Sequence, residues 1–187
     1  AKGIVMGALL LSGYLMQKLL IVGCVCFAVA VGSSSVVVAG FYDGVTAFDN
    51  GDYKTALREF RVSAIKGDAR AQYNLGVMYR TGKGVSKDYK EADRWYRNAS
   101  ERGHVQAQFS LGLMYKVGLI GKKYKKGTGI VINYVKAYKW FSIAASSGHA
   151  ISKKNLRIIE GQMTSGDISK AQKLAQEWMR VWPIKSP

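Results

Sequence analysis

The chain has 187 residues, 28 Lys plus Arg against 12 Asp plus Glu, and a formal net charge of +16. Its hydrophobic fraction of 48% and its 2 prolines exclude a disordered tail and a collagen-like chain. The length suits one or two small domains with a packed core. The surplus of positive charge indicates an anionic partner, which would be nucleic acid, a membrane surface or an acidic protein.

Residues 1–39 have the pattern of a secretory signal peptide. Read from Met16, a short basic region ends at Lys18, an apolar run extends from Leu19 to Val31, and a stretch of small residues ends at Ala39. This order of basic, apolar and small residues is typical of a signal that is removed on export. We therefore expect Met16 to be the working start and the mature domain to begin at residue 40.

Three other interpretations of this segment remain open. It could be an uncleaved membrane anchor, although Gly23, Gly32 and a run of serines interrupt the apolar stretch. It could carry a lipid on Cys24, because the residues before that cysteine fit a lipobox. It could also be a buried core helix. An anchored or lipidated form would associate with the membrane.

The cysteines follow the same division. Cys24 and Cys26 both lie in the apolar segment, so the mature chain would contain none and would depend on its packed core alone. An exported protein does not normally meet nucleic acid. The sequence therefore predicts a periplasmic protein with no nucleic-acid partner.

An internal repeat dominates the chain from residue 41 onward. Ala71–Gly76 recurs as Ala107–Gly112, a period of 36 residues, and each copy is followed by a similarly spaced Tyr, Ala and Trp. Spacings of three, four and seven residues place the apolar side chains on single helix faces. Degenerate copies flank the two full repeats, at residues 53–60 and 168–174.

Each repeat is predicted to be a pair of antiparallel helices. Gly76, Gly112, Ala92 and Ala137 are small where two helices must approach closely, and aromatic residues fill the space between units. One pair cannot bury its apolar stripe, whereas stacked pairs can. The prediction is an all-α, right-handed solenoid of about four helix pairs, with units at 41–67, 68–103, 104–148 and 149–182, and with the segment from Ile168 to Trp182 as a closing helix.

The junctions between units share a glycine followed by a polar residue. A glycine can adopt the left-handed conformation that ends a helix, and a polar residue can begin the next one. His104 and His149, the only histidines, lie at equivalent junctions. We therefore expect them to be boundary residues and not metal ligands, and we expect no cofactor. The three junctions are Gly67-Asp68, Gly103-His104 and Gly148-His149.

The pattern in residues 69–99 closely resembles the Sel-one-like repeat, a relative of the tetratricopeptide repeat. A second copy at 105–144 matches at its packing positions, and the resemblance extends over nearly all of 41–182. Small exported members of this family include accessory factors of envelope assemblies and immunity proteins that neutralise secreted toxins. The resemblance therefore implies a non-catalytic protein-binding adaptor, although the residues that carry it are packing residues.

Two surfaces are candidates for binding the partner. If the first helix of each pair lines a groove, as in related repeats, the residues facing a ligand would be Arg70, Tyr73, Arg80, Gln106, Phe109 and Lys116. The second candidate is a lysine-rich insertion between Tyr115 and Tyr134, which contains Lys122, Lys123, Tyr124, Lys125 and Lys126.

The charge is unevenly distributed along the chain. Residues 105–187 hold fourteen basic and three acidic side chains, a balance of +11, whereas residues 41–104 carry only +3. Exposed positive charge of this density attracts an acidic protein, and that attraction should weaken with salt. The predicted function is therefore an envelope adaptor, such as an immunity protein or an assembly factor, that binds an acidic partner.

The sequence leaves two other function classes open. Ser63 and Lys66 match the S-x-x-K motif of penicillin-binding enzymes, which would make the chain a β-lactam or cell-wall hydrolase. The other motifs of that class do not accompany them, so we predict no enzymatic activity. The third class is a peripheral binder of anionic lipid or glycan that would use the lysine-rich insertion.

Overall fold

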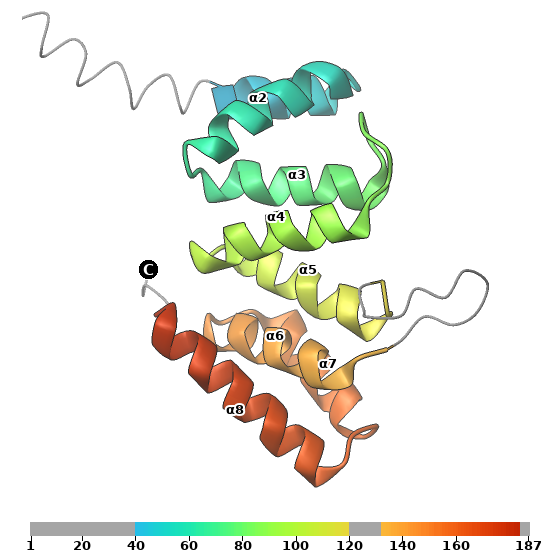
Figure 1. Ribbon diagram of the computed structural model, residues 1–187, viewed down its shortest axis with the longest axis vertical. Coiled ribbons are helices and arrows are strands. Elements are labelled where there is room, and N and C mark those ends of the chain that lie inside the picture. Colours follow the sequence, from blue (N-terminus) through green and yellow to red (C-terminus); the bar gives the residue numbers. More distant parts are fainter. Residues whose placement is uncertain (1–39, 120–131, 184–187) are drawn as a thin grey trace, which may run out of the picture.

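The computed structural model describes residues 40–119 and 132–183 (Figure 1). The predicted signal segment and residues Lys122–Lys126 of the insertion lie outside the described residues. Within them all regular structure is α-helical, which confirms the predicted fold class. The helices are residues 40–49, α2 (Tyr53–Ile65), α3 (Ala69–Thr81), α4 (Tyr89–Glu101), α5 (Val105–Lys116), α6 (Tyr134–Ser146), α7 (Ala150–Glu160) and α8 (Ser165–Val181).

From α2 to α7 each helix packs against the next one in the chain (Figure 1). The most extensive packing is within two antiparallel pairs, α3 with α4 and α5 with α6, and α2 and α7 join the stack at either end. The closing helix α8 lies against α6. No helix within 40–119 and 132–183 is long and apolar enough to span a membrane.

Polar side chains begin the helices at the predicted junctions. Asp68 accepts hydrogen bonds from backbone N–H groups in the first turn of α3, and the two histidines do the same for α5 and α7. The glycine before each of them has a positive φ, between 82° and 92°, which a residue with a side chain adopts only with strain. The predicted role of His104 and His149 as boundary residues is thus explained by helix capping.

Glycines allow the two helices of a pair to approach closely. A Cβ atom on Gly76 would lie 2.5 Å from the ring of Tyr96 in α4. A Cβ atom on Gly112 would lie equally close to the ring of Phe141 in α6. Both rings are fully buried. The predicted close approach at these glycines is therefore present. The two rings lie inside the helix pairs, on the backbone of the first helix, and not between units as predicted.

The closing helix begins earlier than its apolar pattern indicates. The hydroxyl of Thr164 accepts a 3.1 Å hydrogen bond from the N–H of Asp167, so α8 starts at Ser165 and not at Ile168. The ring of Trp178 meets Trp140 of α6 edge to face, with 5.5 Å between ring centroids. The helix therefore covers the end of the stack, as a cap should.

Candidate partner-binding surface

Aromatic rings on the first helices of two successive pairs lie against the histidines that cap the next first helices. Tyr73 of α3 stacks on the imidazole of His104 with 4.7 Å between centroids, and Phe109 of α5 lies 4.8 Å from His149. All four rings are half-buried, so one edge of each remains exposed to solvent. The repeat therefore places a ring against the next capping histidine twice, stacked for Tyr73 and tilted for Phe109.

Arg70 extends this set of contacts toward the N-terminal end. Its guanidinium lies 4.2 Å from the ring centroid of Phe41 and pairs with Asp68 at 2.7 Å, and the side chain remains exposed. Partial burial alone would raise the pKa of Asp68, but hydrogen bonds from the Arg70 side chain and backbone lower it. Arg70 is thus held in place with its charge available. We call the surface formed by Arg70, Tyr73, Gln106 and Phe109 the first-helix face, and Gln106 is exposed within it.

Two of the residues predicted for the groove make bonds inside the fold. Arg80 donates a 3.2 Å hydrogen bond from Nε to the Tyr96 hydroxyl in α4. Lys116 donates a 2.8 Å hydrogen bond from Nζ to Oδ1 of Asn155 in α7. Both side chains join neighbouring helices. Arg80 and Lys116 therefore differ from Arg70 and Gln106, which are exposed and do not join neighbouring helices in this way.

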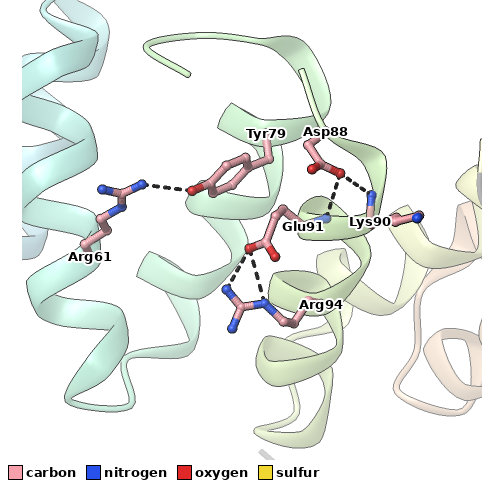
Figure 2. A network of polar contacts seen from close by, with 6 residues as sticks. All are labelled: Arg61, Tyr79, Asp88, Lys90, Glu91 and Arg94. Carbon is pink, nitrogen blue, oxygen red and sulfur yellow. Dashed lines mark hydrogen bonds and ion pairs between the residues drawn. The ribbon is translucent and has the colours of Figure 1, made fainter. Parts of the chain in front are cut away.

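A second repeated contact was not foreseen from the sequence. Arg61 of α2 donates a hydrogen bond to the hydroxyl of Tyr79 in α3 at 2.9 Å, as Figure 2 shows. Thirty-six residues further on, Arg97 makes the same contact with Tyr115 at 2.5 Å. In both contacts the tyrosine follows the arginine by 18 residues, and the two contacts are one repeat period apart. That recurring spacing is the sequence signal that could have revealed the contact.

The acidic residues near the start of α4 are occupied by structural contacts. Asp88 accepts hydrogen bonds from the backbone N–H groups of Lys90 and Glu91, and Glu91 pairs with Arg94 at 2.6 Å (Figure 2). Asp93 pairs with a second arginine of the same helix. Among the described residues no group of three or more His, Cys, Asp or Glu side chains could hold a metal ion.

The proposed nucleophile of the hydrolase interpretation is buried. Ser63 has no exposed surface, and its hydroxyl has no hydrogen-bond partner among the described residues. Lys66 lies exposed at the end of α2. A hydroxyl that a substrate cannot reach does not act as a nucleophile in this conformation, so the structure gives the motif no support.

Sequence reasoning also missed a basic hollow beside α7. It has a volume of about 580 Å³ and combines three cations with an exposed isoleucine. Among the described residues no carboxylate lies within ion-pair distance of these cations. The sequence signal for this hollow was the cluster of basic residues in α7, which the packing pattern of the repeat does not require. We call this hollow the α7 groove, and it is lined by Ala150, Lys153, Lys154, Arg157 and Ile158.

Stacked antiparallel helix pairs with a recurring set of contacts define the chain as a helical repeat protein. The model of the Sel1 repeat matches residues 69–104 and 105–149, so the chain contains two Sel1 repeats. These two matches contain both close-packed glycines and both histidines that contact an aromatic ring. The resemblance stated from the sequence is thereby confirmed.

Solved structures with the same repeat are similar to the chain. One is a protective antigen of uropathogenic Escherichia coli strains that displays an SLR fold, with 32% identity and a TM-score of 0.68, covering 78% of this chain and 30% of that one. Another is a Sel1 repeat protein from Oxalobacter formigenes, with 30% identity and a TM-score of 0.54, covering 74% of this chain and 55% of that one. The comparison with curated proteins finds no match.

The chain thus spans less than two thirds of the length of these solved relatives. Sel1 repeats generally mediate protein–protein interaction, and proteins built from them are generally non-catalytic. Because the repeat defines packing positions, it does not specify which partner is bound.

Proposed function

We propose that the chain is a non-catalytic adaptor of the bacterial cell envelope that binds an acidic protein. The observation that carries this proposal is the first-helix face, where Arg70 and Gln106 are exposed beside the half-buried rings of Tyr73 and Phe109. Arginine and aromatic side chains held in fixed positions are the residues that dominate binding energy at protein interfaces. Their contacts within the fold lower the entropy that is lost on binding.

The charge of the chain supports an acidic partner. The balance of +11 in residues 105–187 adds long-range attraction to the short-range contacts of the first-helix face. An immunity protein or an assembly factor is a suitable role, because both capture another protein and neither needs a catalytic group. A partner of this kind would dissociate more readily as salt screens the exposed charges.

Export is part of the same proposal. The signal pattern of residues 1–39 supports a periplasmic location, and lipidation of Cys24 or an uncleaved segment would instead keep the protein at the membrane. N-terminal sequencing of protein recovered from fractionated cells separates these forms. A new N-terminus near residue 40 in the periplasmic fraction is expected, whereas the intact segment in the cytoplasmic fraction would contradict export.

The binding proposal is tested by affinity capture from a bacterial envelope extract followed by mass spectrometry. The captured protein is then purified and titrated by calorimetry against the wild type, Arg70→Ala and Arg58→Ala. Arg58 is a matched control, because it is also exposed and also pairs with an adjacent carboxylate, that of Glu59 at 2.9 Å.

Arg70→Ala is expected to weaken binding by about tenfold, the equivalent of about 1.4 kcal/mol. Arg58→Ala is expected to leave the affinity unchanged. Equal effects of the two variants would remove the first-helix face from the proposal. Multiple turnover of a substrate by the purified protein would contradict the adaptor function itself.

A further inference from the structure

The helix α7 differs from the earlier first helices in what covers it. In α3 and α5 the face that carries Gly76 or Gly112 is covered by a buried ring from the following helix. The equivalent position in α7, 45 residues after Gly112, is Arg157, and it is exposed. The following helix, α8, packs extensively against α6 and not along α7. The face of α7 that a second helix would cover is therefore open.

A second packing position, one turn earlier, also changes to an exposed cation. Gln108 of α5 is fully buried, and its Nε2 donates a hydrogen bond to the carbonyl oxygen of Ser100. Its equivalent in α7 is Lys153, which is exposed. Lys153 and Arg157 both line the α7 groove. Two packing positions of the repeat have thus become cations on an uncovered surface.

The chemistry of the α7 groove combines positive charge with aliphatic surface. Ile158 lines the groove and is 47% exposed. Ile151, seven residues earlier and 56% exposed, lies on the same side of the helix beside the groove. The acidic residue of α7, Glu160, accepts a hydrogen bond from the Tyr138 hydroxyl at 3.0 Å, so it lies toward α6. A ligand that matches this groove needs both carboxylates and aliphatic side chains.

We propose that the α7 groove binds an acidic amphipathic helix of a protein partner, which takes the place that α4 occupies against α3. This inference rests on the proposed function, because it names where and how an acidic protein would dock. The 11 residues of α7 extend over about 16 Å, so a helix of about three turns matches it in length. Its carboxylates pair with Lys153 and Arg157, and its aliphatic face covers Ile151 and Ile158.

Charge argues against the other occupants. A second copy of this chain, with a net charge of +16, has few carboxylates to offer, and the chain's own Lys122–Lys126 segment has the same sign as the groove. All the lining residues lie along α7, which suits an elongated helical ligand, and binding to a membrane is one outcome of the test.

The test uses a fluorescent synthetic 18-residue peptide that forms an amphipathic helix, with leucines on one face and glutamates on the other. Its affinity for the wild-type protein is measured by fluorescence anisotropy. Lys153→Glu combined with Arg157→Glu is compared with Lys170→Glu combined with Lys173→Glu on α8. The control pair is also exposed and changes the net charge equally. Circular dichroism verifies that both variants fold.

The α7 variant is expected to bind the peptide at least about tenfold more weakly, because each reversed charge removes an attraction and adds a repulsion. The control variant should bind like the wild type. Ile158→Ser should weaken binding without changing its salt dependence. No measurable binding, or equal losses in the two charge variants, would overturn the proposal.

Two further measurements separate this inference from its alternatives. Vesicles of phosphatidylglycerol and phosphatidylethanolamine are tested with the same variants, and α7-dependent vesicle binding without peptide binding would assign the groove to membranes and overturn the proposal. If the partner captured from the envelope extract binds the α7 variant as tightly as the wild type, the groove proposal fails while the adaptor function stands.

Discussion

The Arg97 guanidinium of α4 donates a 2.5 Å hydrogen bond to the hydroxyl of Tyr115 in α5, across the boundary between two repeats. It also pairs with Asp93 one turn earlier in α4, at 2.8 Å. Burial alone would lower the pKa of Arg97, but the contacts with Asp93 and Tyr115 raise it. Burial raises the pKa of Tyr115. The arginine therefore holds a half-buried carboxylate and a buried phenol at one interface.

This relationship predicts that Arg97→Met is clearly destabilising. Methionine keeps much of the aliphatic stem but leaves the half-buried carboxylate of Asp93 without its partner, at a cost of about 1–3 kcal/mol in the free energy of unfolding. Arg61 makes the equivalent contact from an exposed position, so Arg61→Met should cost less than about 0.5 kcal/mol. Urea unfolding followed by circular dichroism measures both, and equal costs would contradict the burial argument.

The close approach of helices predicts the effect of a single added methyl group. Gly112→Ala places a carbon 2.5 Å from the ring of Phe141, and relieving that clash costs about 1–3 kcal/mol, more than the gain of about 1 kcal/mol in helix propensity. Gly166→Ala, in the first turn of α8, meets no atom closer than 3.9 Å and should be neutral or stabilising. Thermal unfolding compares the two, and a higher melting temperature for Gly112→Ala would show that the interface is looser than described.

Burial lowers the pKa of His104 below the ordinary value of about 6.5 for an imidazole. The protonated form is therefore favoured in the unfolded state, so this contribution to stability is present above about pH 6.5 and is lost as pH falls through the lowered pKa. Protonation of Nδ1 would also remove the acceptor that caps α5 at the Ala107 N–H.

His104→Asn keeps a capping side chain but removes the titration. The free energy of unfolding of the wild type should fall between about pH 7 and pH 5, and the variant should show a smaller fall over the same window. Urea titrations at several pH values measure how the free energy of unfolding changes with pH. Parallel curves for the two proteins would show that His104 does not titrate as described.

The burial of Ser63 separates the adaptor from a hydrolase. Because its hydroxyl is buried and has no hydrogen-bond partner among the described residues, Ser63→Ala should leave stability unchanged or raise it by up to about 1 kcal/mol. Hydrolysis of a chromogenic β-lactam should be at background for both proteins. An activity present in the wild type and lost in Ser63→Ala would contradict the adaptor function.

The repeat pattern predicted the fold because packing positions are local and periodic. The spacing of Gly76, Tyr96 and their equivalents encodes which faces meet, and the glycine-polar junctions encode where helices begin and end. The apolar pattern places the start of the closing helix at Ile168, whereas α8 begins at Ser165, because Thr164 caps the helix before that pattern begins.

The candidate surface was less predictable for a physical reason. Whether a long cation such as Arg80 or Lys116 faces a ligand or a neighbouring helix depends on side-chain reach across a tertiary interface, which periodicity does not contain. The α7 groove depends on where α8 packs, which is a property of the closing unit and not of the repeat. Residues Lys122–Lys126 of the lysine-rich insertion lie outside the described residues, and their role stays a prediction.

The proposed function requires that a cation-bearing surface of this helical repeat captures an acidic protein. Calorimetric titration of the partner isolated from the envelope extract tests it most directly, with the wild type, Arg70→Ala, and Lys153→Glu combined with Arg157→Glu. We expect a saturable complex that weakens with added salt and loses at least about tenfold in affinity in one or both variants. A complex whose affinity is the same in all three proteins and independent of salt would contradict it.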